Sequence, residues 1–412
     1  MPAGMVVVMQ AWRRLWFSAA LVLSVLAFIW RRLMFRTTFI AITGSVGKTS
    51  AKECLTAMLS SRFLTNAMIG NDNGRQGLAS TILRTRYRHR FTVIEAATRR
   101  PGALRRAAWE MRPDVVVVLA VARTHINHFP TLEHTAAEKA SLLDRLPPSG
   151  LAILNGEDPR VLAMADRCRC RVVTFGRSPR FDFWASEVSA RWPSRLTFRI
   201  HTATQFQEVR TNLAGEYWLS PVLGALAAAV CCGMDLKDAV RALEQAQPYR
   251  ARLQPVALPC GATLLRDDEN GSVTALQEAL GVMKEAEVPR RIAVLGDTWD
   301  SGLGEPRARL EDLGRRVAGT VDLAVFVGEQ AHYAAEALIA SGMKPENVRS
   351  ISGLRETAEF LKSELRPGDL ALLKGQYMQH LSRIYLAQLG PVQCWKMKCL
   401  EVTPCERCEE LS

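Results

Sequence analysis

The residues best suited to chemistry in this 412-residue chain form a short glycine-rich turn near its start. Such a turn lets backbone N–H groups face a phosphate, and a helix that begins there adds favourable partial charge. Lys48 would neutralise the β- and γ-phosphates, and the Thr49 hydroxyl would bind Mg²⁺. A chance glycine-rich turn is disfavoured, because an apolar run precedes these residues and a helix-like stretch follows. The predicted phosphate loop is Gly44, Ser45, Val46, Gly47, Lys48, Thr49 and Ser50.

Such a loop needs a sheet to position it, and the flanking sequence predicts one. Short apolar runs alternate with helix-like stretches, which is typical of a mostly parallel α/β sheet. The expected strands are residues 39–43, 91–95, 115–121, 151–155 and 172–175, and an alanine-rich helix is expected over residues 221–232. A second α/β set is expected after residue 252, with strands near residues 262–266, 292–296, 323–327 and 370–373.

The N-terminus carries an apolar segment over residues 15–30, which contains no charged side chain. Arginine pairs flank it, and Trp12, Trp16 and Trp30 stand near its ends, where interfacial aromatic residues belong. A full span needs about 20 residues, so snorkelling arginines and the next apolar residues would have to complete it. We expect a transmembrane or anchor helix; a buried core helix and a cleaved signal peptide are the alternatives.

The net charge of +12 is concentrated in two stretches. Residues 1–36 carry five arginines and no acid, and residues 84–112 carry nine arginines against Glu95 and Glu110. Beside an apolar N-terminus, a basic patch favours membrane lipid headgroups as a partner. Nucleic acid is disfavoured, because no aromatic residues alternate with the basic ones in a base-stacking pattern.

Further polar residues follow the loop in a recognisable order. Asn71 and Asn73 lie in a Gly-Asn-Asp-Asn-Gly stretch, Glu95 ends an expected strand, His125 follows a threonine, and Lys139 ends Ala-Ala-Glu-Lys. With the loop, this series resembles the Mur ligase superfamily across about residues 38–390. The resemblance implies that Asn71 and Asn73 contact the substrate and that Lys139 is carbamylated by CO₂. It implies that the Mg²⁺ ligands are Thr49, Glu95, His125 and Lys139.

The second half carries the same resemblance. Asp267 and Asn270 lie in Asp-Asp-Glu-Asn-Gly-Ser, which is similar to the nucleotide-contacting stretch of the D-alanyl-D-alanine-adding branch. Lys374, before Gly375, matches a later motif of that branch, and Arg252 is expected to stabilise phosphate charge. We therefore expect Lys48, Lys139, Arg252 and Lys374 to be catalytic, and Asp267 and Asn270 to bind ATP.

The resemblance implies a central ATPase domain and a C-terminal Rossmann-like domain. The expected segments are a membrane segment at 1–36, an ATP-binding domain at 37–250, a ligase domain at 251–390 and a cysteine-containing tail at 391–412. No counterpart of the family's N-terminal UDP-binding domain is recognised, since the apolar segment takes its place. In the tail, Cys394, Cys399, Cys405 and Cys408 leave zinc as a disfavoured alternative to a disordered or redox-active tail.

The implied activity is ATP-dependent joining of a carboxylate to an amino acid or peptide amine through an acyl phosphate, in cell-envelope or specialised peptide synthesis. Phosphoryl transfer to a carboxylate brings two anions together, so cations must screen them; two Mg²⁺ ions are expected. ATP chemistry and reduced cysteines place the body on the cytoplasmic side of the membrane. The alternatives are a catalytically degenerate nucleotide-binding scaffold at the membrane, and a P-loop kinase or transport ATPase.

Overall fold

The computed structural model of the chain describes residues 20–97, 100–123, 128–298, 304–396, 399 and 404–411. The chain divides into two compact units. The first comprises Met1–Glu187, Phe198–Val209 and Leu219–Ala246, and the second comprises Val188–Thr197, Arg210–Trp218 and Gln247–Ser412. The predicted segment boundaries after residues 36, 250 and 390 stay predictions.

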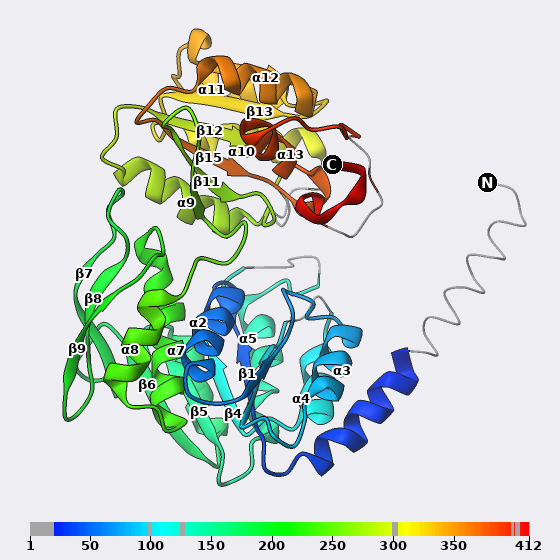
Figure 1. The fold of residues 1–412 in the computed structure, drawn as a ribbon, viewed down its shortest axis with the longest axis vertical. Coiled ribbons are helices and arrows are strands. Elements are labelled where there is room, and N and C mark those ends of the chain that lie inside the picture. Colours follow the sequence, from blue (N-terminus) through cyan, green and yellow to red (C-terminus); the bar gives the residue numbers. More distant parts are fainter. Residues whose placement is uncertain are drawn as a thin grey trace, which may run out of the picture. The chain divides into compact units, whose positions relative to one another are not determined.

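The first sheet has nine strands among the described residues (Figure 1). Its order is β2 (Thr65–Ala67), β3 (Phe91–Glu95), β1 (Thr38–Thr43), β4 (Val115–Val118), β5 (Leu151–Asn155), β6 (Arg171–Gly176), β7 (Phe183–Ser189), β8 (Thr197–His201) and β9 (Phe206–Arg210). The strands from β2 to β7 pair in parallel. Because β1 lies between β3 and β4, the loops that follow these three strands meet at one edge of the sheet.

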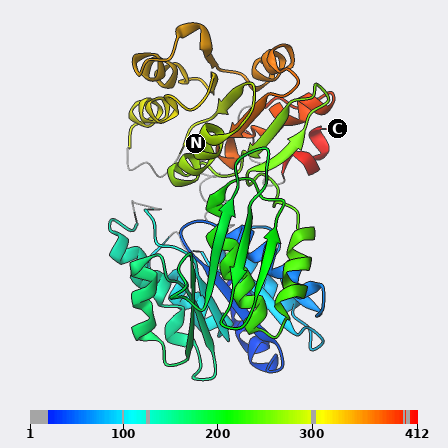
Figure 2. The same ribbon diagram turned by 90° about the vertical axis from the view of Figure 1, so that its left-hand side faces the viewer.

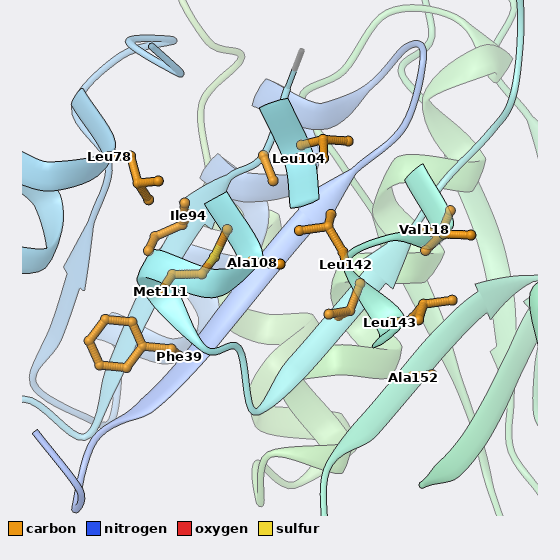
Figure 3. Packing of buried hydrophobic residues seen from close by; sticks show 14 of the residues in the cluster. Phe39, Leu78, Ile94, Leu104, Ala108, Met111, Val118, Leu142, Leu143 and Ala152 are labelled. Atoms are coloured by element: carbon orange, nitrogen blue, oxygen red, sulfur yellow. The ribbon is translucent and has the colours of Figure 1, made fainter. Parts of the chain in front are cut away.

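Helices cover this sheet and bury its apolar residues. They are α2 (Lys48–Ser60), α3 (Arg75–Arg84), α4 (Ala103–Met111), α5 (Leu132–Ala140), α6 (Pro159–Leu162), α7 (Leu219–Cys231) and α8 (Leu236–Gln245). Figure 3 shows part of one core cluster, in which Leu104 and Met111 of α4 pack with Phe39 and Ile94 of the sheet. The valine run of β4 is buried throughout, as expected of a central parallel strand that is covered on both faces.

The second unit contains a six-stranded sheet among the described residues, in the order β10 (Gln254–Ala257), β11 (Thr263–Asp267), β15 (Leu370–Lys374), β12 (Arg291–Leu295), β13 (Leu323–Val327) and β14 (Val348–Ile351). Only β10, at the edge, is antiparallel to its neighbour. The helices are α9 (Val273–Glu285), α10 (Pro306–Val317), α11 (His332–Ala340), α12 (Leu354–Glu364) and α13 (Ser382–Leu389). The predicted α/β class is confirmed.

Two details differ from the sequence-based expectations. The strand expected over residues 115–121 ends at Val118, because the backbone turns there into the loop that faces the glycine-rich turn. The short outermost strands β2, β10 and β14 were missed, and so were β7, β8 and β9 (Figure 2). The last three lie at one edge of the sheet and bury at most alternate residues, so they lack the continuous apolar runs of the central strands.

A helix over residues 20–33 precedes β1 and covers part of the predicted apolar segment, whose residues 15–19 lie outside the described residues. One side of this helix packs on the first unit and buries Ser24, Ala27 and Arg31. Figure 1 shows it as the dark blue helix beside α3 and α4. Within the part of the chain that the structure describes, no helix is long and apolar enough to cross a membrane.

Candidate active site

The glycine-rich turn connects the end of β1 to the start of α2, as the sequence predicts. The loop that follows β4 holds it in place. The Ser45 N–H donates to the Ala120 carbonyl at 2.8 Å, and the Ala122 N–H donates to Ser45 Oγ at 2.8 Å. Val46 and Lys48 are half-buried, whereas Ser50 is buried within α2. The start of α2 therefore lies beside the carboxyl end of the central strand, where an anion would meet the N-terminus of the helix.

Two glycines of the turn are required by close packing. A Cβ at Gly44 would lie 2.9 Å from Leu119 Cβ. Gly47 caps α2 with a φ of +77°, and a Cβ there would lie 2.3 Å from Cγ of Pro221 at the start of α7. Side chains at these positions would clash, and at Gly47 they would also strain the backbone. Both positions therefore require glycine for packing, in addition to the expected role of the turn in phosphate binding.

Three predicted residues from three separate segments meet beside the turn. The Thr49 hydroxyl donates to Glu95 Oε2 at 2.8 Å, and the Asn73 side-chain amide donates to Glu95 Oε1 at 2.9 Å. Glu95 ends β3 and is buried, and Thr49 is buried in the first turn of α2. A hydroxyl beside a carboxylate is a donor set of hard oxygens, which is what Mg²⁺ prefers. The residues present thus fit a magnesium ion.

The two predicted catalytic lysines of the first unit lie on different helices. The Lys48 ammonium donates to the carbonyls of Gly44 at 2.8 Å and Ser45 at 3.2 Å, so it stays over the turn. Lys139, in the last turn of α5, is buried. Burial and the positive charge of Lys48 lower the pKa of Lys139 to about 7, against the opposing effect of Glu138. The structure therefore places these two predicted catalytic lysines in electrostatic contact.

Glu138 fixes the last turn of α5 against another helix. Its two carboxylate oxygens accept hydrogen bonds from the N–H groups of Gly102 and Leu104, each at 2.8 Å. These are N–H groups at the N-terminus of α4, which lack partners within their own helix. The Glu138 side chain therefore caps α4 and holds the last turn of α5, which includes Lys139, against that helix.

Lys52 is a residue that the sequence reasoning missed. It lies one turn after Lys48 on α2 and is almost fully buried. Its ammonium donates to the carbonyls of Met68 at 2.7 Å and Gly70 at 2.6 Å, and it lies 2.6 Å from a Glu53 oxygen. It thereby holds the start of the loop that carries Asn71 and Asn73. The available signal was a lysine on the buried side of α2.

Asn155 and Asp158 also position the site. The Asn155 amide donates to the Leu119 carbonyl at 2.7 Å, and Asp158 Oδ2 accepts from the Val121 N–H at 2.7 Å. Together they fasten the loop that holds Ser45. The motif Leu-Asn-Gly-Glu-Asp is visible in the sequence, but this bracing role depends on the β4–β5 pairing.

The predicted residues of the second unit form a buried ion pair. Asp267 ends β11 and Lys374 ends β15, and the two are partners in the parallel register. The Lys374 ammonium contacts Asp267 Oδ2 and donates to the Asn270 carbonyl at 2.6 Å. Burial raises the pKa of Asp267 and lowers that of Lys374, because it disfavours both charges.

Arg252 and the side chain of Asn270 lie near this pair. Arg252 follows Ala251, whose φ is +51°, and its charge acts on both Asp267 and Lys374. Asn270 Oδ1 accepts from the Ser272 N–H at 3.3 Å at the start of α9. In the first unit, Asn71 is exposed in the loop after β2. The binding and catalytic roles expected of these residues stay predictions.

His125 lies outside the described residues. The ten cysteines are all free, and Cys405 Sγ lies 3.4 Å from Nδ1 of His380. Among the described residues, no group of three or more histidine, cysteine or acidic side chains could hold a metal ion. The disfavoured zinc alternative for the tail thus has no support from its described part.

A parallel sheet with a glycine-rich turn, a following lysine and threonine, and an acidic residue on the neighbouring strand defines a P-loop nucleotide-binding enzyme. Two family models match the chain, the Mur ligase middle domain over residues 42–229 and the glutamate ligase domain of Mur ligases over residues 251–377. The chain belongs to the Mur ligase family, whose members use ATP and Mg²⁺. It is an ATP-dependent ligase that forms carbon–nitrogen bonds.

Similar proteins include UDP-N-acetylmuramoyl-tripeptide–D-alanyl-D-alanine ligases. That of Mycobacterium tuberculosis (strain CDC 1551 / Oshkosh) is 31% identical over 383 residues, which cover 88% of this chain and 74% of that protein. That of Escherichia coli (strain K12) is 30% identical over 311 residues, covering 74% and 67%. A crystal structure of MurF from Acinetobacter baumannii is 25% identical with a TM-score of 0.81, covering 90% of this chain and 80% of that one.

Proposed function

We propose that this chain joins the carboxyl group of a peptidoglycan precursor peptide to the amine of a short peptide such as D-alanyl-D-alanine. The similarity to ligases named for that reaction supports the choice of both substrates. The stretch from Asp267 to Ser272, which is close to that branch, supports it as well. ATP drives the reaction on the cytoplasmic side of the membrane.

The reaction proceeds in two steps whose atoms balance. A carboxylate oxygen attacks the γ-phosphorus of ATP, the bond to the bridging oxygen breaks, and ADP leaves with that electron pair. The amine nitrogen of the second substrate then attacks the carbonyl carbon of the acyl phosphate. Inorganic phosphate leaves, the nitrogen loses a proton, and an amide remains. Each step forms one bond while breaking another, so one activated intermediate links the cleavage of ATP to amide formation.

The first unit supplies the groups that hold and screen the phosphates. The turn presents the start of α2 to the triphosphate, and Lys48 neutralises charge on its outer groups. Thr49 and Glu95 would hold Mg²⁺, which would screen the charge that develops between the γ-phosphate and the carboxylate. Asn73 orients the Glu95 carboxylate through its amide and, with Asn71, borders the carboxylate substrate.

Lys139 acts as a carbamate in this proposal. An ammonium group that is buried beside Lys48 faces a like charge, which is unfavourable. After the ammonium loses a proton, the neutral amine nitrogen attacks the carbon of CO₂ and releases a second proton. An anionic carbamate then replaces the cation, so the contact becomes attractive and its oxygens would be available to hold a second Mg²⁺. His125 is the proposed partner ligand for that ion. The proposed nucleotide-contacting residues of the C-terminal domain are Arg252, Asp267, Asn270 and Lys374.

The observation that carries the proposal is the contact of Thr49 and Asn73 with the two oxygens of Glu95 at the start of α2. The test supplies purified protein with ATP, Mg²⁺, UDP-N-acetylmuramoyl-tripeptide and D-alanyl-D-alanine, and then with a panel of other carboxylates and amines. We expect phosphate release that requires both substrates, and a product with the mass of the amide. No release above a Lys48→Ala control with any pair would overturn the ligase proposal.

The scaffold alternative is not favoured. A degenerate nucleotide-binding protein has no need to keep a buried carboxylate between a hydroxyl and an amide, as Glu95 is kept here. A Glu95→Gln variant separates the two interpretations, because it removes one charge and keeps the side-chain shape. We expect it to lower turnover much more than ATP binding. The predicted contact of residues 1–36 with membrane lipid is separate from this activity.

A further inference from the structure

The helix over residues 20–33 is fixed to the first unit along one side. Arg31 donates to the carbonyls of Met111 at 2.6 Å and Arg112 at 2.7 Å, and it pairs with Asp114 at 2.9 Å. The Trp30 indole N–H donates to the Thr85 carbonyl at 2.9 Å. These bonds to the ends of α3 and α4 orient the helix, so its opposite side has a defined direction.

That opposite side is a continuous apolar strip. Its members each expose 46–58% of their surface, and they are Leu21, Val22, Val25, Leu26, Ile29 and Leu33. At about 100° per residue, these six positions fall within an arc of ~140°. A surface helix of a globular protein normally carries polar residues on that side, and an exposed apolar patch of this kind marks an interaction site. We call these six residues the outer strip.

Aromatic and basic residues border the outer strip. Trp109 of α4 is exposed and stacks on Phe28 with ring centroids 3.8 Å apart. The guanidinium of Arg32 lies 3.0 Å from the centroid of the Phe28 ring. Tryptophan and arginine together are typical of the boundary between lipid headgroups and acyl chains.

The basic residues continue around the C-terminal end of the helix. The loop after α3 contains Tyr87, whose ring centroid lies 6.0 Å from that of Trp30. The exposed arginines nearby in sequence are Arg86, Arg88 and Arg90 in this loop, Arg36 after the helix, Arg105 and Arg106 in α4, and Arg112 directly after α4. The acids of residues 84–112, Glu95 and Glu110, are both buried, so they present no carboxylate to a partner at this surface.

We propose that the outer strip and its arginine border form an in-plane docking surface for an anionic phospholipid bilayer. The strip would enter the boundary between headgroups and acyl chains while the arginines contact lipid phosphates, as in monotopic amphipathic helices. Charge decides against a second copy of the chain, because two such faces would bring their arginine borders together. The proposal does not depend on the ligase activity.

Vesicle flotation of the full-length protein tests this surface. The vesicles contain phosphatidylcholine alone or phosphatidylcholine with phosphatidylglycerol. We expect binding to the anionic vesicles, weakened at least tenfold in Val25→Glu/Ile29→Glu. The matched control is Leu64→Glu/Phe206→Glu, which alters two apolar residues of similar exposure outside the strip, and we expect it to bind like the unchanged protein.

A second variant leaves the helix intact. Arg86→Gln/Arg88→Gln removes two exposed charges from the border, and we expect it to bind anionic vesicles several-fold more weakly and with less salt dependence. Three results would overturn the proposal. They are no flotation of the unchanged protein, equal flotation of Val25→Glu/Ile29→Glu, or a dimer without vesicle binding that this variant converts to a monomer in sedimentation.

Discussion

The two units use charged residues at the ends of parallel strands in opposite ways. In the first unit, Glu95 bonds only neutral groups, the Thr49 hydroxyl and the Asn73 amide, among the contacts described above. In the second unit, Asp267 meets a full positive charge on Lys374, and both side chains are buried. The same position in a sheet thus holds a carboxylate able to accept a cation in one case and a carboxylate already neutralised in the other.

The difference indicates which charged side chains are available for catalysis and which are already neutralised in an ion pair. A carboxylate that bonds neutral donors keeps its charge for a metal or a substrate. A buried pair such as Asp267 with Lys374 satisfies itself, and removal of one partner leaves an uncompensated charge. We therefore expect substitutions in the first unit to affect turnover, and substitution of Lys374 to affect stability first.

The largest expected effect is that of Lys374→Met. It leaves Asp267 buried without its cation, which costs about 3–5 kcal/mol of unfolding free energy. Urea unfolding measures this loss. The double variant Asp267→Asn/Lys374→Met removes both charges and should regain most of the stability. A loss of unfolding free energy below about 1 kcal/mol in the single variant would contradict this comparison. It would show that the ion pair contributes little to stability, which would leave Lys374 available for catalysis.

Lys48→Ala should come next and should affect activity alone. Loss of a cation that screens the transferred phosphate is expected to lower kcat about 10²–10³-fold. Because Lys48 is only half-buried, the unfolding free energy should change little. Steady-state kinetics and urea unfolding measure the two quantities. The control is Lys237→Ala, an exposed lysine of α8, and equal kinetics for both variants would exclude the proposed role.

Lys52→Met tests whether Lys52 holds the loop that carries Asn71 and Asn73. The carbonyls of Met68 and Gly70 lose a donor, which should cost about 1–3 kcal/mol of stability. The loop with Asn71 and Asn73 should become less ordered, so KM for the carboxylate substrate should rise more than KM for ATP. Lys237→Met serves as the exposed control. Equal increases in both KM values would show that Lys52 supports the fold without positioning this loop.

Per pH unit, the smallest expected effect on stability is a pH dependence at Lys139. Its pKa is about 7 when folded and 10.5 ordinarily, so between these values the unfolded chain holds the extra proton. Stability should therefore rise with pH across this window, by up to about 1.4 kcal/mol per pH unit, with no contribution to the slope below or above it. Thermal unfolding of wild type and Lys139→Met in CO₂-depleted buffer measures the difference. Parallel curves would contradict the lowered pKa of Lys139.

Much of the fold could be predicted because central parallel strands form short, mostly apolar runs that are easily recognised in the sequence. The runs at β1, β3, β4 and β5 are mostly apolar, and they are buried at almost every position because both faces are covered. Edge strands such as β9 bury only Val209 and give a weak pattern. The predicted phosphate loop could be recognised equally well, because phosphate binding by such a turn needs neighbouring residues in a fixed order.

The sequence by itself determined the α/β class, the glycine-rich turn and three residues that lie beside it, Thr49, Asn73 and Glu95. Only the tertiary structure decided that Asn73 and Thr49 share the carboxylate of Glu95, that Lys52 holds the start of the loop with Asn71 and Asn73, and that Lys374 is paired with Asp267. The physical reason is separation along the chain. Spacing reports neighbours within a turn or a helix, whereas partners on different strands are set by sheet order and register.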